Sequence, residues 1–432
     1  MRLGLGWHVS DEHLGSDTPF FRDAAAELLD SGRYTETSGE SVKSTLKHPP
    51  GFVLVLAAGE AVGIDRVTEQ RVMLALIEVL GVALLGLAGF RIGGSVVGTL
   101  AAGVAAVHPM WTQPGVVIMS ESIYLTVVSA AILAAVVHLE RRTPLTAAGT
   151  GALVAGAALV RSEALLALIL MAPVIVLVSN LDWRHRGRLA VGFMLGAAVV
   201  LGPWLIRNTV VSGAPVISTN AGVTLAGSNC DQTYSGANQG GFALRCGLAG
   251  AVGARSATTE SPGPAREVDI DSRMQDEALD YARQHPRQAL TTSFVRVLRT
   301  WTPAHLEAQV HLDTAEGRLP RWQTAGRWMH GALMVPAVVG AVALHRTDGR
   351  RALVLAVFVV QVSVTSALVY GSARMRSAAE PSIALYAAFG VATVIGWLGR
   401  RDVAAPTEVG TEGAVDLSSA PRRRLAYSPA PW

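Results

Sequence analysis

Several ionisable side chains in this sequence stand beside long apolar segments, where charge is costly and usually functional. Asp17 lies in "GSDTPFF", and Arg374 and Arg376 lie in "YGSARMRSAAEP", before the last apolar segment. A carboxylate can accept a proton from a hydroxyl group, and a guanidinium presents a planar set of donors that suits phosphate oxygens. Whether such groups act together depends on the elements that carry them.

Each of these residues also has a structural alternative that the residues alone leave open. Asp17 precedes Thr18 and Pro19, which is a good context for a helix N-cap. Arg374 and Arg376 could extend along a helix end toward water.

Further charged residues occur between or beside the apolar segments. Arg207 follows "PWLI" and could contact phosphate or anchor a helix at the membrane interface. Arg161 and Glu163 lie between two apolar runs that are too close for a full loop, so they could pair with one another or face a cavity. Glu121 and His48 are candidates for the same cavity.

The composition is typical of a polytopic membrane protein. Of 432 residues, 50% are hydrophobic and only 16% are charged, whereas about a quarter are charged in soluble domains. The formal net charge is +3, but the Lys and Arg residues occur in short groups between apolar runs, without a basic stripe. A nucleic-acid partner is therefore not expected. Membrane lipids are the expected partners.

Apolar runs long enough to cross a hydrocarbon core of about 30 Å predict the membrane spans. Their Gly and Ala residues allow helices to approach closely. Nine spans are predicted, at 69–90, 93–108, 116–138, 144–160, 162–179, 188–206, 327–346, 350–370 and 378–398.

Positive charge alternates between the short loops and predicts the orientation. The loops "FRIGG", "LERRT", "DWRHRGR", "HRTDGRR" and "GRRD" are expected on the cytoplasmic side. The segment "HPPGFVLVLAAGEAVG" is interpreted as a juxtamembrane helix opened by its prolines, although a short span is an alternative. The predicted organisation is an outer first segment (1–68), spans (69–206), a large outer segment (207–326), spans (327–398) and a disordered cytoplasmic tail (399–432).

The polar start of the chain is unexpected in this topology. An outer segment normally follows a span that carries it across, yet only "MRLGLGW" precedes the polar region. We therefore expect a first transmembrane helix that this sequence lacks.

The two cysteines, Cys230 and Cys246, both lie in the large outer segment. A disulfide between them would close a loop of about 17 residues and stabilise the segment by about 3 kcal/mol. The alternative is two free thiols. Their spacing matches no zinc or redox motif.

Seven segments, taken in order, resemble the GT-C superfamily of membrane glycosyltransferases, in particular the branch of protein O-mannosyltransferases and lipid A aminoarabinose transferases. The resemblance covers residues 15–395. Its segments are "SDTPFFRDAAAELLDSGRYT", "HPPGFVLVLAA", "MSESIYLTVVSAAILA", "ALVRSEALLAL", "GPWLIRNTVVSGAPVISTNAGVTLAGSN", "YARQHPRQALTTSFVRVLRTW" and "YGSARMRSAAEPSIALYAAFG".

The resemblance implies an all-α GT-C fold in a bacterial plasma membrane, with its active site on the extracytoplasmic side. It implies inverting transfer of a sugar from a polyprenyl-phosphate donor to a glycan, lipid or protein acceptor. The resemblance makes Asp17 the catalytic base. Independently of it, Arg374, Arg376 and Arg207 are expected to bind the donor phosphate, because arginine presents a planar set of donors that suits phosphate oxygens. No cofactor besides the lipid-linked sugar and no metal are expected.

Two other functions remain alternatives. A secondary transporter would share intramembrane charges and outer cavities, but it usually shows inverted repeats, which are not evident here. A non-catalytic relative could bind the lipid carrier, and it would leave Asp17 far from the arginines.

Overall fold

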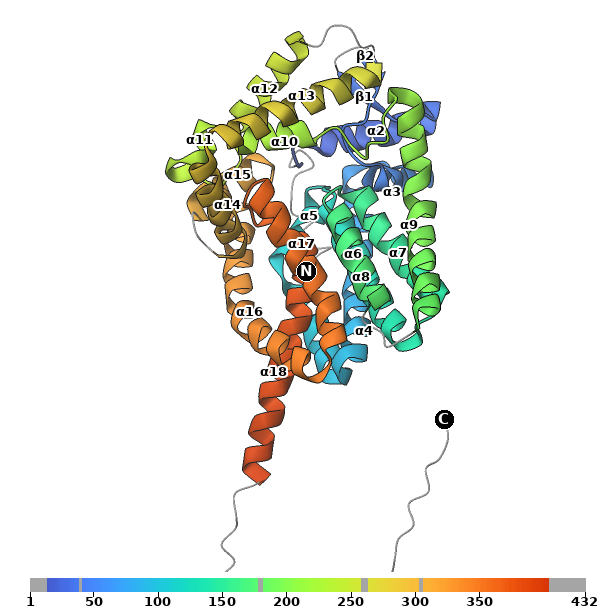
Figure 1. Ribbon diagram of the computed structural model, residues 1–432, viewed down its shortest axis with the longest axis vertical. Coiled ribbons are helices and arrows are strands. Elements are labelled where there is room, and N and C mark those ends of the chain that lie inside the picture. Colours follow the sequence, from blue (N-terminus) through green and yellow to red (C-terminus); the bar gives the residue numbers. More distant parts are fainter. Residues whose placement is uncertain (1–13, 39–40, 178–181, 258–262, 303–305, 404–432) are drawn as a thin grey trace, which may run out of the picture. The chain divides into compact units, whose positions relative to one another are not determined.

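The computed structural model describes residues 14–38, 41–177, 182–257, 263–302 and 306–403. The N-terminal segment "MRLGLGW", to which the expectation of a missing first helix refers, and the tail from residue 404 onward lie outside these residues. Nearly all of the described chain is helical (Figure 1). The chain divides into two compact units, Met1–Thr393 and Val394–Trp432, and the described part of the second is the end of α18.

The first half of the chain contains the following elements, numbered as in Figure 1. They are α2 (Thr18–Ser31), β1 (Thr35–Ser38), β2 (Ser41–Ser44), α3 (Gly51–Glu60), α4 (Val67–Val107), α5 (Pro109–Val116), α6 (Glu121–Arg141), α7 (Pro144–Val160), α8 (Ala164–Leu177) and α9 (Trp183–Ser212). The two strands form an antiparallel pair in which Thr35 faces Ser44.

The second half contains several short helices before its long ones. They are α10 (Ala221–Ser228), α11 (Asp231–Tyr234), η1 (Gly236–Asn238), α12 (Leu244–Ala257), α13 (Gly263–Gln284), α14 (Pro286–Trp301), α15 (Leu306–Ala315), α16 (Pro320–Thr347), α17 (Gly349–Leu368), η2 (Arg374–Ala378) and α18 (Glu380–Val403).

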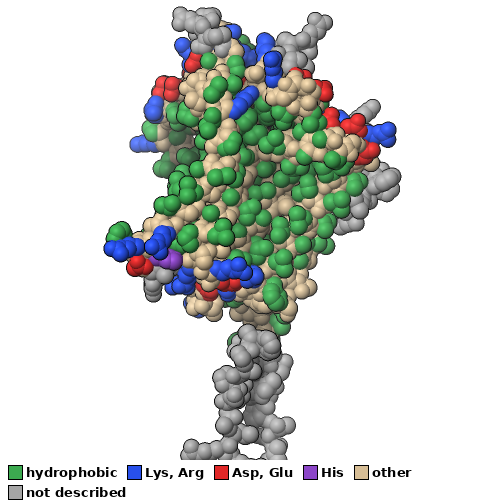
Figure 2. Space-filling model, turned by 90° about the vertical axis from the view of Figure 1, so that its right-hand side faces the viewer, with side chains coloured by type: hydrophobic (Ala, Val, Ile, Leu, Met, Phe, Trp, Pro, Cys, Tyr) green, Lys and Arg blue, Asp and Glu red, His purple; other side chains and the backbone are tan. Residues whose placement is uncertain are grey.

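Six of the described helices, α4, α6, α9, α16, α17 and α18, are long and apolar enough to cross a membrane. Figure 2 shows a broad belt of hydrophobic side chains on one face, with charged side chains gathered above and below it. The prediction of an all-helical, multi-pass membrane protein is confirmed.

The helix α4 contains two of the nine predicted spans. Its backbone leaves helical geometry at Gly93 and Gly94, where φ is −149° and +80°. A Cβ atom on Gly89 would lie 2.9 Å from the Cα of Gly98, so the two halves pack side by side as a hairpin. The predicted span 144–160 matches α7, which has 17 residues, and the predicted span 162–179 corresponds to α8, which is shorter, with 14 residues.

The predicted start of a span at residue 116 is wrong. Residues Pro109–Val116 form the separate buried helix α5, which contains Pro114, and Ile118 follows with a φ of +52°. The next helix begins only at Glu121. Pro114 and the left-handed turn at Ile118 therefore separate two helices that hydropathy joins.

Glycine allows the shorter helix α7 and the long helix α9 to pack closely. A Cβ on Gly151 of α7 would lie 2.1 Å from the carbonyl oxygen of Phe193, and one on Gly196 of α9 would lie 2.0 Å from that of Ala148. Close backbone approach of this kind holds helices together where lipid provides no hydrophobic drive.

The loops predicted to share one side of the membrane do lie together. Glu140 accepts hydrogen bonds from Arg91 at 2.6 Å and from Arg351 at 3.2 Å. A ring nitrogen of His185 lies 2.9 Å from the carbonyl oxygen of Arg142. Four loops from separate parts of the sequence therefore meet at one end of the bundle, as their charge pattern predicts; which side of the membrane this end faces stays a prediction.

Candidate functional site

A cavity of about 560 Å³ lies at the other end of α6 and α17. Its polar wall combines residues from the start of α2, from the segment before α3, from the junction of α7 and α8, and from η2. The residues from these places, with Ser120 at the start of α6, are Asp17, His48, Ser120, Arg161, Ser162, Glu163 and Arg374; Ser218, Asn220, Thr224, Thr365 and Tyr370 also line the cavity. Five of the predicted site residues are thus brought together from distant parts of the sequence.

Asp17 faces this cavity instead of capping α2. It occupies the N-cap position, but its side chain makes no capping hydrogen bond. One carboxylate oxygen, Oδ2, lies 3.8 Å from Nη2 of Arg374, and the side chain is 32% exposed. The N-cap interpretation is therefore wrong, because the carboxylate is directed at the arginine.

The backbone around Asp17 is fixed by neighbours on both sides. The hydroxyl of Thr18 donates to the carbonyl of Val117 at 2.8 Å, and the amide of Gly15 donates to the same carbonyl at 3.0 Å. The amide of Ser16 donates to the carbonyl of Glu316 at 3.3 Å. The carboxylate is thus held at a defined position at the cavity wall.

Glu121 lies behind the cavity wall and gathers three guanidinium groups. Its Oε1 lies 2.8 Å from Arg161 and 3.0 Å from Arg318, and it also accepts from Nε of Arg374. Its side chain is only 1% exposed. Glu121 is therefore too deeply buried to contact an acceptor directly, and its role is to position the arginines.

Replacing Glu121 with Gln is expected to lower the free energy of unfolding by about 3 kcal/mol, because three buried cations would lose their shared carboxylate. Equilibrium unfolding in detergent measures this change. The matched control is Glu69→Gln, which removes a surface carboxylate from an exposed pair with Arg66 and should cost less than about 1 kcal/mol. Equal losses in the two variants would contradict the positioning role.

Arg374 joins the cavity to a second carboxylate. Its Nη1 donates to Glu316 Oε2 at 3.0 Å, and its side chain is 12% exposed. Burial disfavours the charged guanidinium of Arg374, but the negative charges of Glu121, Glu316 and Asp17 outweigh it and raise the pKa of Arg374. Arg374 is thus a permanent cation whose outer edge faces Asp17.

The turn after α15 supplies two site residues that the sequence did not single out, Glu316 and Arg318. Gly317 between them has a φ of +87°, and a Cβ there would lie 2.2 Å from the carbonyl oxygen of Leu14. Only glycine fits this turn against the start of the chain. Two charges around a glycine, just before the proline that opens α16, were the available signal.

Arg161 and Glu163 form the predicted pair, with Arg161 Nε donating to Glu163 Oε1 at 2.5 Å. Arg161 ends α7, and its guanidinium lies 5.8 Å from the centre of the Tyr124 ring. Because Arg161 also contacts Glu121 and both members of the pair line the cavity, pairing and cavity lining occur together.

Arg376 does not line the cavity, although it is close to Arg374 in sequence. Its Nε donates to Glu380 Oε1 at 2.5 Å, and its Nη1 donates to the carbonyl of Thr300 at 2.8 Å. Its side chain is 2% exposed. The structure therefore places Arg376 in a buried ion pair that anchors η2 and leaves it no access to a donor phosphate in this cavity.

Arg207 also lies outside the cavity lining. Its guanidinium donates to the carbonyls of Thr45 at 3.0 Å and Tyr34 at 3.1 Å, and it lies 5.0 Å from the centre of the Trp204 ring. Arg207 therefore fastens the two-stranded segment to α9.

His48 contributes an imidazole between two phenylalanine rings. The ring centres of Phe20 and Phe21 lie 4.8 Å and 5.2 Å from that of His48. Its Nε2 is buried and has no hydrogen-bond partner in the described part of the chain. Burial lowers the pKa of His48 to about 4, although Asp17 opposes this shift. His48 is therefore neutral at pH 7.

This lowered pKa predicts a pH dependence of stability. Between about pH 6.5 and about pH 4 the unfolded chain binds a proton at His48 that the folded chain does not, so stability falls as the pH is lowered through this window. His48→Asn is expected to remove that part of the slope. Melting temperatures of wild type and variant are measured from pH 4 to pH 8, and the difference between them should shrink as the pH is lowered. A difference that is the same at every pH would contradict the assignment.

Part of the cavity wall is apolar. It is lined by Leu165 and Leu166 of α8, Val364 and Leu368 of α17, and Leu225 of α10. Leu368 is 63% exposed, so this wall continues to the outer surface of the bundle.

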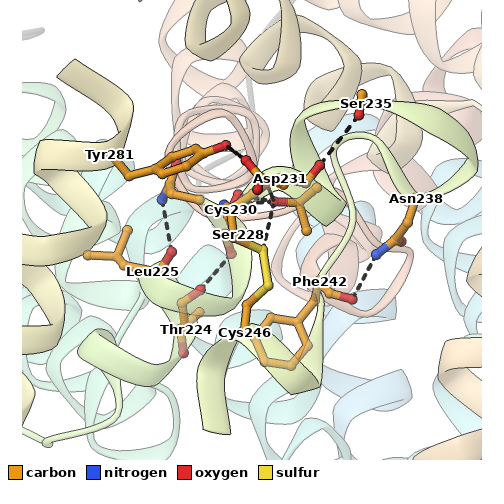
Figure 3. The surroundings of a disulfide bond; sticks show 12 residues. Thr224, Leu225, Ser228, Cys230, Asp231, Ser235, Asn238, Phe242, Cys246 and Tyr281 are labelled. Carbon is orange, nitrogen blue, oxygen red and sulfur yellow. Dashed lines mark hydrogen bonds between the residues drawn. A yellow bond between two sulfur atoms is a disulfide. The ribbon is translucent and has the colours of Figure 1, made fainter. Parts of the chain in front are cut away.

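A disulfide between Cys230 and Cys246 holds the segment that contributes α10 to this wall (Figure 3). It joins the start of α11 to α12. Beside it the Tyr281 hydroxyl donates to Asp231 Oδ1 at 2.6 Å. Asp271 of α13 accepts from the amide of Gly222 at 2.6 Å, which ties α10 to α13.

Removing the disulfide in the double variant Cys230→Ser/Cys246→Ser is expected to destabilise this segment by about 3 kcal/mol, since an open chain has more conformational freedom when unfolded. Hydrogen exchange of α10 to α12 measures the loss. Reductant should reproduce the change in wild type and leave the double variant unaffected. Unchanged exchange in both would contradict a structural disulfide.

In the described residues, no group of three or more His, Cys, Asp or Glu side chains is arranged to hold a metal ion. The cations that the described cavity wall presents are the guanidinium groups of Arg161 and Arg374.

The structure resembles an archaeal membrane enzyme. The apo crystal structure of the Archaeoglobus fulgidus oligosaccharyltransferase aligns with a TM-score of 0.53 and 14% identity, over 93% of this chain and 49% of that chain. The A. fulgidus AglB complex with an inhibitory peptide and a dolichol-phosphate gives a TM-score of 0.50 and 12% identity, over 93% and 49%. The chain thus spans about half the length of these structures.

A weaker likeness is found to ArnT from Cupriavidus metallidurans bound to undecaprenyl phosphate, with a TM-score of 0.39 and 17% identity over 96% of this chain and 81% of that chain. No protein-family model matches the sequence, and no curated protein is significantly similar to it. The likeness to the archaeal structures shows the fold: this chain shares the fold of the A. fulgidus oligosaccharyltransferase, in agreement with the predicted all-α membrane fold.

Proposed function

We propose that this protein transfers a hexose or pentose from a polyprenyl-phosphate donor to an extracytoplasmic glycan, lipid or protein acceptor in a bacterial plasma membrane. One observation carries the proposal. A carboxylate, Asp17, and a guanidinium, Arg374, lie 3.8 Å apart in the wall of a cavity that is also lined by apolar side chains of α8 and α17. The GT-C fold favours a transferase over a secondary transporter.

Asp17 would act as the general base. The acceptor hydroxyl oxygen attacks the anomeric carbon, its proton passes to the Asp17 carboxylate, and the bond between that carbon and the phosphate oxygen breaks with its electron pair leaving on phosphate. Attack from the face opposite the phosphate would invert the anomeric centre. The partial exposure of Asp17 leaves room for the acceptor beside it.

Arg374 and Arg161 would stabilise the departing phosphate. Both line the cavity, and fixed cations placed where negative charge develops favour the transition state. Glu121 contacts both guanidinium groups, so it holds them in place without reaching the substrate itself.

The apolar wall between α8 and α17 would accommodate the first isoprenoid units of the donor. Leu165, Leu166, Val364 and Leu368 offer no polar groups, and a chain of hydrocarbon units is stabilised by such surroundings. In the AglB complex, that enzyme holds a dolichol-phosphate and an inhibitory peptide together, which supports a lipid phosphate as the ligand of this fold.

The alternative of a non-catalytic lipid-carrier protein predicts that Asp17 lies far from the arginines. The distance of 3.8 Å to Arg374 argues against it. A carboxylate at the polar end of the cavity would repel a bound phosphate. A protein that only carries the lipid would gain nothing from it, whereas a transferase needs it as a base.

The proposal is tested by supplying membranes that contain the full chain with a panel of radiolabelled polyprenyl-phosphate sugars. We expect one donor to lose its sugar to an acceptor fraction, and unlabelled polyprenyl phosphate to inhibit this transfer. Membranes without the protein are the control. Failure of every donor to bind or to transfer would contradict the proposal and would direct the next experiments to transport.

A further inference from the structure

A second cavity, of about 340 Å³, lies about 30 Å along α6 and α17 from the first, at the opposite ends of these helices. It is formed where the loop after α6 meets the loop between α16 and α17. Its charged lining residues are Glu140, Arg142, Asp348, Arg350 and Arg351.

Both carboxylates in this cavity are already paired. Glu140 accepts from Arg91 and Arg351, and Asp348 Oδ2 lies 3.4 Å from Nε of Arg351. Asp348 also accepts from the backbone amide of Arg351 at 3.1 Å, in the first turn of α17. With Arg91 included, four guanidinium groups face two carboxylates, which leaves an excess of two positive charges.

Two of the guanidinium groups retain free donors. Arg142 uses its Nε to donate to the carbonyl of Leu139 at 3.2 Å, and no partner of its two Nη atoms is found among the described residues. Arg350 likewise has no hydrogen-bond or ion-pair partner within the described part of the chain. Donors of this kind beside an open cavity suit an oxyanion.

The backbone at Arg142 supports a binding role. Its φ of +52° and ψ of +42° are left-handed, a conformation that costs a non-glycine residue free energy. Two contacts hold this conformation. The Arg142 amide donates to the carbonyl of His138 at 2.7 Å, and Nε2 of His185 lies 2.9 Å from the carbonyl oxygen of Arg142. Strain maintained in this way often accompanies a functional site.

We propose that this cavity binds the phosphate group of an anionic phospholipid. The same donors could hold free phosphate, but the position favours a lipid, because the cavity lies at the ends of membrane-spanning helices. Trp183 and Leu145, which are 78% and 81% exposed, begin the adjoining helices α9 and α7, and Trp is enriched at membrane interfaces. Positive side chains also border the lower edge of the apolar belt in Figure 2.

The test measures melting temperatures of the purified full chain in detergent with added phosphatidylglycerol, with added phosphatidylcholine, or with inorganic phosphate at matched ionic strength. We expect phosphatidylglycerol alone to raise the melting temperature. The variant Arg142→Gln/Arg350→Gln should need about tenfold more of this lipid for the same shift. The matched control Arg141→Gln/Arg346→Gln, in the last turns of α6 and α16 but outside the cavity lining, should behave as wild type.

Three results would overturn the proposal. The first is equal lipid dependence in the site variant and the control. The second is an equal shift with phosphatidylcholine, and the third is full reproduction of the shift by inorganic phosphate, which would assign the cavity to a soluble anion. If the double variant does not fold, Arg350→Gln alone removes a guanidinium that has no described partner and should weaken the lipid dependence about threefold. Sugar transfer is not the readout, so this test is independent of the proposed activity.

Discussion

Asp17→Asn is expected to reduce the rate of sugar transfer by about 10³-fold while the donor still binds. Asn has nearly the same shape and can occupy the same position at the start of α2, but it cannot accept a proton. The hydrogen bonds that fix this backbone come from Gly15, Ser16 and Thr18, so the substitution should leave the fold intact. Transfer rates and donor binding, measured in the same membranes, separate the chemical step from binding.

The matched control is Asp23→Asn. Asp23 lies on the same helix and is exposed, and it does not line the cavity. Its substitution should change transfer by less than about twofold. If Asp17→Asn transfers sugar as fast as this control does, the carboxylate is not the base and the assignment fails.

Arg374→Gln is expected to lower the rate of transfer by about 10³-fold, because the departing phosphate would lose a cation placed beside it. The protein should still fold. Glu121 keeps Arg161 and Arg318 as partners, and Glu316, whose pKa burial raises, can take up a proton when Arg374 is absent.

Arg374→Lys distinguishes charge from geometry. It keeps one positive charge but loses the planar set of donors that contacts Glu121 and Glu316 together. We expect intermediate activity. Arg321→Gln, an exposed substitution at the start of α16, is the control. Wild-type transfer by Arg374→Gln would show that phosphate is stabilised elsewhere.

Much of the fold could be predicted because membrane spans have a strong and simple sequence signal. Each predicted span overlaps a helix or one half of the α4 hairpin, and the predicted helix after the two prolines is α3, with 10 residues; its juxtamembrane position stays a prediction. Hydropathy does not register a turn whose residues are themselves apolar. The break at Ile118 between α5 and α6 was therefore missed.

The site was predicted in part. The order of motifs selected Asp17, His48, Arg161, Glu163 and Arg374, which the fold collects around one cavity. The prediction for Arg376 was wrong because it relied on its closeness to Arg374 in sequence. Arg376 follows Arg374 by two residues in the tight turn of η2, and this places its side chain on the buried side.

Other positions depend on contacts that only the folded chain creates. Arg207 is committed to backbone carbonyls of a distant segment. Glu316 and Arg318 reach the site because Gly317 lets their turn approach Leu14. The contacts of Arg207 have no local sequence pattern, and the only local signal for Glu316 and Arg318 was a pair of charges around a glycine.

The most direct test of the central claim is a paired measurement of donor binding and sugar transfer for wild type and Asp17→Asn, using membranes with equal amounts of each protein. The account predicts that both proteins bind the same polyprenyl-phosphate sugar and that only wild type transfers it at an appreciable rate. Transfer at the wild-type rate by Asp17→Asn, or a lack of binding and transfer in both proteins with every donor, would contradict it.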